Sequence, residues 1–240
     1  ERCRRERSNA DVNKLVNWKK ANERVNTLSK AHGENKVHMP KRKPALQGNN
    51  DIDDMKNNYP NINHNSYKFK NRRGAYGLTA SFIQFLKKNK NNSYSMWYED
   101  DALPTINYNF IVEMKKALNN LPKKGNDVYY FGFTNYCRTE CDKSEKKWNK
   151  KNNNSSGSHA ILFTRESVNT ILNYYYFNKI NIPIDNLLDL LNNKKYINSW
   201  YISGYKSYTD HMICGLFYQD KTYCHKRENI VDHEMGGKRV

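Results

Sequence analysis

The chain has 240 residues, of which 37% are hydrophobic, and its 41 Lys and Arg against 24 Asp and Glu give a formal net charge of +17. That length suits one α/β domain with a buried core, and the absence of a long apolar run excludes a membrane-spanning helix. The charge would attract polyanions, although lysines spread along the whole chain are also typical of a solvated surface. The 5 cysteines at irregular spacings indicate free thiols rather than a disulfide framework, so we expect a cytoplasmic protein, or a luminal one if a signal segment precedes this chain.

The first third of the chain alternates between periodic and irregular sequence. Residues 11–28 have the spacing of an amphipathic helix. Residues 29–70 lose that periodicity and are rich in His, Pro, Asn and Asp, which predicts an irregular lid or linker. Residues 74–88 are again predicted to be helical, with Leu78, Phe82 and Phe85 on one face.

An apolar strand over residues 94–98 leads directly into the acidic run Glu99-Asp100-Asp101. Neighbouring carboxylates repel one another unless a cation lies between them, and hard divalent cations such as Mg²⁺ and Mn²⁺ prefer carboxylate oxygen. Acidic runs are also common on solvated loops. The position of Glu99-Asp100-Asp101 directly after an apolar strand favours a metal site that would in turn hold a phosphate.

Strand-like and helix-like segments alternate through the rest of the chain. We expect helices at 108–121, 165–176 and 184–191, strands at 128–133 and 160–163, and a charged low-complexity insertion at 135–158. Strands separated by helices imply a mostly parallel central sheet flanked by helices, with ligands at the carboxyl ends of the strands. The sequence therefore predicts a single α/β domain over residues 1–240 with long irregular insertions.

Six short motifs occur in the order found in one known family. They are Gly74–Ser81, Glu99–Asp101, Asp127–Gly132, Gly157–Phe163, Pro183–Asp185 and Phe217–Asp220. Together they resemble glycosyltransferase family 25, which includes lipopolysaccharide and procollagen galactosyltransferases, and the likeness extends from Gly74 to Asp220.

The resemblance implies a GT-A fold and transfer of a hexose, such as galactose or glucose, with inversion. The donor would be a nucleotide-diphosphate sugar, above all a UDP-sugar, and the acceptor a hydroxyl of a glycan or glycoprotein. A divalent cation, Mn²⁺ rather than Mg²⁺, would neutralise the departing diphosphate. The resemblance implies Glu99, Asp101 and His211 as metal ligands and Asp185 as the base that takes the acceptor proton. The implied donor-binding residues are Arg4, Arg5, Gly74, Gly77, Ser81, Asp100, His159 and Gln219.

Simpler roles remain open for several of these residues. Asp185 could instead be the N-cap of a helix, and His159 could be a structural hydrogen-bonding residue beside a strand. Two other functions also compete. A basic chain rich in aromatic residues suits a nucleic-acid-binding protein, but no known nucleic-acid-binding motif is present and the acidic run would repel phosphates. An inactive glycosyltransferase-like scaffold is the third possibility.

Overall fold

The computed structural model describes residues 52–70, 73–99, 102–104, 109–135, 145–151, 155–205 and 213–219. The helix expected at 11–28 lies outside these residues. So do five of the predicted site residues: Arg4, Arg5, Asp100, Asp101 and His211.

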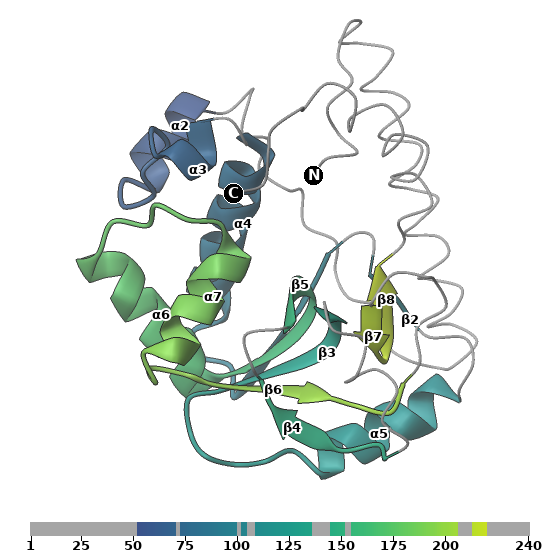
Figure 1. Cartoon of the computed structure of the whole chain (residues 1–240). Coiled ribbons are helices and arrows are strands. Elements are labelled where there is room, and N and C mark those ends of the chain that lie inside the picture. Colours follow the sequence, from purple (N-terminus) through teal and green to yellow (C-terminus); the bar gives the residue numbers. More distant parts are fainter. Residues whose placement is uncertain are drawn as a thin grey trace, which may run out of the picture.

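Within the described residues, one mixed sheet forms the centre of the molecule (Figure 1). Its strands run in the spatial order β1-β5-β3-β6-β4, β7 also pairs with β3, and β2 and β8 form a separate two-stranded sheet. The strands are β1 (Tyr94–Tyr98), β2 (Ala102–Pro104), β3 (Asp127–Asn135), β4 (Trp148–Lys150), β5 (Ser155–Thr164), β6 (Asn198–Ile202), β7 (Ile213–Gly215) and β8 (Phe217–Gln219).

The expectation of a mostly parallel sheet is wrong. Among the described strands, β3 and β6 alone pair in parallel, whereas β5 pairs antiparallel with both β1 and β3, and β4 and β7 are antiparallel to their neighbours. A parallel neighbour requires a long crossover, usually a helix. The described part of the connection from β3 to β5 contains the strand β4 and no helix, so β5 returns in the opposite direction. The predicted insertion at 135–158 therefore contains β4 and the beginning of β5.

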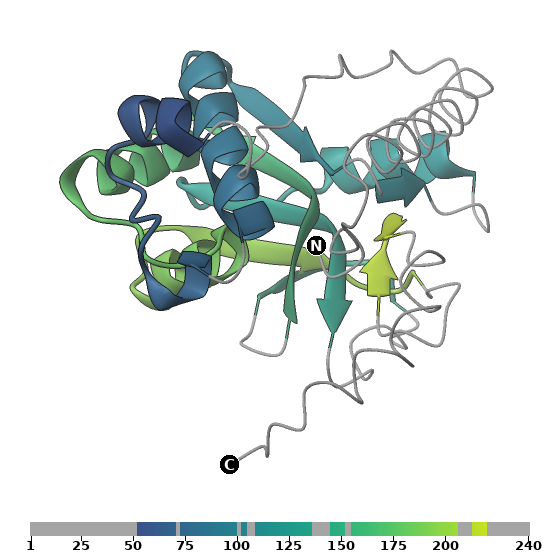
Figure 2. The same cartoon turned by 90° about the horizontal axis from the view of Figure 1, so that it is seen from above.

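Helices cover both faces of the sheet (Figure 2). On one face, α4 (Arg73–Asn89), α6 (Arg165–Phe177) and α7 (Ile184–Asn193) pack their apolar side chains on alternate residues of β1, β3 and β5. On the other face, α5 (Phe110–Asn119) packs against the remaining residues of these strands together with Phe217 of β8. The predicted helices are thus present, because each has an apolar face and a suitable start, such as the Thr164 side chain that caps α6.

Residues 52–70 do not form the irregular stretch that the sequence suggested. They contain α2 (Ile52–Asn58) and α3 (Tyr67–Lys70), and they bury Met55, Tyr59 and Ile62 in the core beneath α4 and α6. The apolar residues here are separated by Asn, Pro and His, so the helices are too short to show a helical period in the sequence.

A buried carboxylate fastens α5 to the end of β6. Glu113 accepts hydrogen bonds from Tyr205 Oη at 2.8 Å and from the Nζ atoms of Lys116 and Lys146, each at 3.1 Å. Burial alone would raise the pKa of Glu113, but these hydrogen bonds and the charge of Lys146 outweigh it and lower the pKa to about 2. Glu113 is therefore a charged structural anchor.

Candidate functional site

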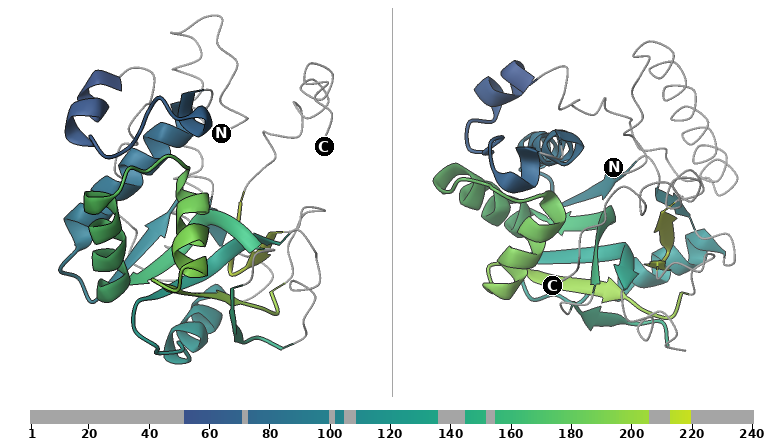
Figure 3. Two further views of the ribbon diagram at one scale, coloured as in Figure 1. Left: turned by 60° about the vertical axis from the view of Figure 1, so that its left-hand side comes forward. Right: turned by 45° about the horizontal axis from the view of Figure 1, so that its top comes forward.

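The carboxyl ends of three strands lie at the same edge of the sheet. β1 and β3 are both antiparallel to β5, so they run in the same direction, and β6 is parallel to β3. Helices α4 and α7 lead into β1 and β6 through short turns and therefore run the opposite way. Their N-termini consequently lie toward this carboxyl edge (Figure 3).

Glu99 and His159 form a cross-strand pair at this edge. Trp97 lies opposite Ile161 in the β1–β5 register, and two residues further on the backbone N–H of Glu99 donates to the carbonyl oxygen of His159 at 2.9 Å. This backbone bond continues the β1–β5 pairing by one residue beyond Tyr98 and Ala160, so Glu99 and His159 are neighbours at this edge. His159 is buried and Glu99 is half-buried. A carboxylate-bearing residue and an imidazole-bearing residue are thus adjacent in the backbone pairing, and both groups are common ligands of divalent transition metals.

The imidazole of His159 occupies the space beside Gly132 of β3. A Cβ atom at position 132 would lie 2.6 Å from His159 Nε2 and 2.6 Å from the carbonyl oxygen of Phe217. Only glycine therefore fits at this position. The Asp127–Gly132 motif contained this residue, but its spatial role could not be recognised without the partner strand.

Gln219 is brought close to the acidic run. β2 begins directly after Asp101, and its first residue, Ala102, lies opposite Gln219 of β8. The Ala102 N–H also donates to the carbonyl oxygen of Glu99 at 3.1 Å. The backbone of Gln219 is thus paired with a residue that is bonded to Glu99.

The predicted residues of α4 begin at the same edge. Gly74 lies exposed in the first turn, Gly77 is buried against the core, and Ser81 is half-buried about two turns into the helix. The first backbone N–H groups of a helix have no acceptor within the helix and therefore suit an anion. The first turn of α4 carries no acidic side chain that would repel one. Ser81 lies further from the edge than Gly74.

Asp185 lies in the first turn of α7. The N-cap residue of this helix is Pro183, so the alternative that Asp185 is the N-cap is wrong. Its charge acts on the buried Tyr130 of β3. Burial, and then the charges of Asp189 and Asp185, raise the pKa of Tyr130 well above its ordinary value, so this phenol stays neutral.

A buried ion pair adjoins Asp185, one helical turn further along α7. Lys151 Nζ bonds to Asp189 Oδ1, lies 5.3 Å above the Tyr130 ring, and belongs to a side chain that is only 2% exposed. The Lys151 backbone N–H also donates to the carbonyl oxygen of Ser199 on β6 at 2.7 Å. Sequence reasoning missed Lys151 because it belongs to a Lys- and Asn-rich run that is typical of a solvated surface.

Among the residues that the structure describes, no three His, Cys, Asp or Glu side chains lie close enough to hold a metal ion. Asp101 and His211 lie outside those residues, so the metal site stays a prediction. No described helix is long and apolar enough to cross a membrane.

The chain matches no protein-family model and no curated protein sequence. Its function is therefore inferred from the geometry of an α/β domain with a mixed sheet and a polar carboxyl edge.

Proposed function

We propose that this chain is a metal-dependent glycosyltransferase that moves a hexose from a nucleotide-diphosphate sugar to a hydroxyl of a glycan or protein. One observation carries the proposal: Glu99 and His159 are neighbours where β1 ends, at the edge of the sheet toward which the first turn of α7, with Asp185, also lies.

The donor half of the proposed site lies at the end of β1. Glu99 and Asp101 would hold a divalent cation, for which carboxylate oxygen is the preferred ligand, and the cation would offset the charge of the departing diphosphate. His159 positions Glu99 from the neighbouring strand, and the first turn of α4 presents backbone N–H groups to the donor. Gln219, whose backbone pairs with Ala102, would contact the donor.

The acceptor half lies at the start of α7. Asp185 takes the proton of the acceptor hydroxyl as that oxygen attacks the sugar carbon, which gives inversion at that carbon. Oδ1 of Asp185 is shielded from solvent, so its basicity depends on the groups around it. Tyr130, on which the charge of Asp185 acts, stays protonated.

Donor binding and turnover can be tested separately. The protein is screened with a panel of nucleotide-sugars, with and without Mn²⁺, by thermal shift and by release of nucleoside diphosphate. Asp101→Asn is expected to abolish the Mn²⁺-dependent shift. Asp185→Asn is expected to keep the shift and lose about 10²–10⁴-fold in turnover, because an amide cannot accept the proton.

Asp53→Asn is the matched control, because Asp53 is exposed on α2, where it pairs with Lys56. It should change neither readout. A panel in which no nucleotide-sugar raises the melting temperature with Mn²⁺ would contradict the proposal. Full turnover in Asp185→Asn would contradict the assignment of the base.

A further inference from the structure

Two segments far apart in the sequence join at an outer corner of the molecule, which we call the lysine–aromatic corner: residues 58–68 and 173–182. The side chain of Asn61 donates to the carbonyl oxygens of Tyr175 and Tyr176 at 3.0 and 3.1 Å. Ser66 Oγ donates to the carbonyl oxygen of Asn181 at 2.9 Å, and Lys179 Nζ to that of Pro60 at 2.8 Å. These bonds hold the two segments in a fixed relation.

Large aromatic side chains extend from this corner into solvent. Phe177 is 86% exposed, Tyr67 is 80% exposed and Tyr176 is 51% exposed, and all three belong to the corner. Their neighbours Tyr59 and Ile180 are buried in the core. The backbone is thus anchored from inside, so the exposure of Phe177 and Tyr67 does not come from a loosely held loop.

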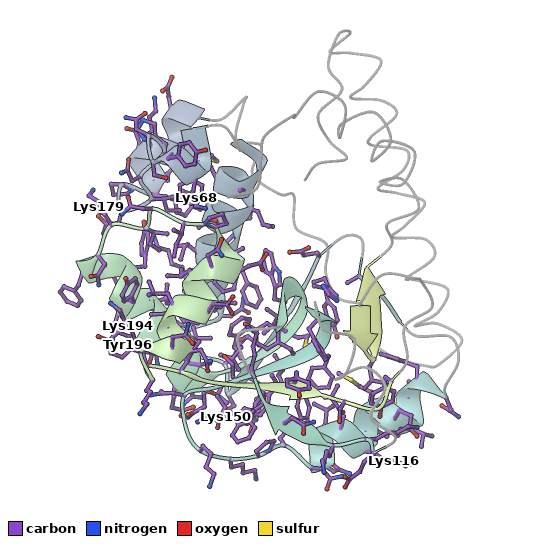
Figure 4. The ribbon with its side chains drawn as sticks, viewed as in Figure 1. Lys68, Lys116, Lys150, Lys179, Lys194 and Tyr196 are labelled. Carbon is purple, nitrogen blue, oxygen red and sulfur yellow. The ribbon has the colours of Figure 1, made fainter. Side chains whose placement is uncertain are left out.

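The two segments of the corner contain basic residues but no acidic ones. Lys68 and Lys179 are exposed within them. Lys87 of α4 lies 5.1 Å from the centre of the Tyr175 ring and 5.9 Å from that of Tyr176. Figure 4 shows Lys68 and Lys179 on the same side of the molecule, with Lys194 and Tyr196 further along that side.

We infer that the lysine–aromatic corner docks on an anionic membrane surface. Aromatic side chains settle at the headgroup level of a bilayer, and lysines beside them are attracted to anionic lipids. The corner protrudes at the C-terminal end of α6 (Figure 1), which suits a flat partner better than a nucleic-acid strand held in a groove. This inference is independent of the proposed enzymatic activity.

The test compares vesicles of phosphatidylcholine alone with vesicles that also contain phosphatidylserine, by co-sedimentation at physiological salt. The protein should bind only the second kind. Lys68→Gln with Lys179→Gln should weaken binding by about 25-fold, since each lysine near an anionic surface contributes about fivefold. Tyr67→Ser with Phe177→Ser should weaken it at least tenfold, and that loss should persist at raised salt.

Matched controls separate the corner from the general basicity of the chain. Lys123→Gln with Lys124→Gln removes the same charge from an exposed turn, and Tyr94→Ser with Leu118→Ser removes exposed apolar groups from other elements. Both should bind within about twofold of the parent protein. Thermal melting and circular dichroism confirm that every variant is folded.

Three results would overturn the inference. The first is no binding to phosphatidylserine vesicles. The second is equal weakening by the corner and control variants, which would mean that binding follows net charge alone. The third is a corner-dependent affinity for a single-stranded oligonucleotide without corner-dependent vesicle binding, which would assign the surface to nucleic acid.

Discussion

The Lys151–Asp189 ion pair makes an asymmetric prediction about stability. The two side chains bond to each other, but that of Lys151 is 2% exposed and that of Asp189 is 29% exposed. Removing the partner of a buried charge costs about 3–5 kcal/mol, whereas a charge that still reaches water is largely rehydrated. We therefore expect Asp189→Asn to be far more destabilising than Lys151→Met.

The magnitudes follow from what each variant leaves behind. Asp189→Asn leaves the ammonium group of Lys151 buried with the Tyr130 ring but without a counter-charge, and should cost about 3 kcal/mol. Lys151→Met removes the charge that was costly to bury, keeps most of the chain length, and leaves Asp189 in contact with water. It should cost about 1 kcal/mol or less.

The double variant completes the cycle. Lys151→Met should rescue Asp189→Asn, so that the double variant is about 2 kcal/mol more stable than Asp189→Asn alone. The measurement is urea unfolding at neutral pH, with thermal melting as a check, since 1 kcal/mol corresponds to about 2–4 °C in a domain of this size. Equal costs for the two single variants, or no rescue in the double, would refute the reasoning from unequal burial.

Two further predictions concern other buried contacts. Glu113, whose pKa is lowered to about 2 from 4.5, contributes stability that is present above pH 4.5 and is lost as the pH falls through 2. Glu113→Gln should therefore cost about 1–2 kcal/mol of unfolding free energy at pH 7, less than the upper limit of about 3 kcal/mol because Lys116 and Lys146 are exposed. In urea unfolding, the difference from the parent protein should shrink as the pH is lowered toward 2. A difference that does not change with pH would contradict this. Gly132→Ala should cost at least about 1–3 kcal/mol in the same assay, because its Cβ would meet both His159 and a backbone oxygen, and an unchanged melting temperature would contradict the packing described at this position.

The sequence predicted the elements better than their arrangement. The strand at 94–98 is present with the predicted bounds, and the helices α4, α6 and α7 differ from expectation by one or two residues at their ends. These segments are long or strongly patterned, so local periodicity suffices to identify them. β6 was not predicted, because its polar and aromatic residues follow a helix without a run of β-branched residues.

Strand pairing depends on contacts between distant residues, and local pattern does not contain them. Gly132 lies opposite Ala160, and this pairing leaves room for His159. It exists only because β5 returns beside β3. The burial of Lys151 likewise depends on α7, which follows it in the chain by more than thirty residues. A composition rich in Lys and Asn conceals such a residue, since Lys and Asn are mostly exposed in proteins.

The expected gathering of site residues does not require the parallel sheet from which it was inferred. A carboxyl edge forms wherever the contributing strands share a direction, and β1, β3 and β6 do so although β5 lies between two of them in the opposite direction. The antiparallel direction of β5 decides which of its residues meets Glu99. His159 lies in the middle of β5, directly before Ala160, which pairs with the last residue of β1, Tyr98. Because β5 runs against β1, the residue that follows Tyr98 meets the residue that precedes Ala160, so the backbone bond between Glu99 and His159 depends on the mixed topology.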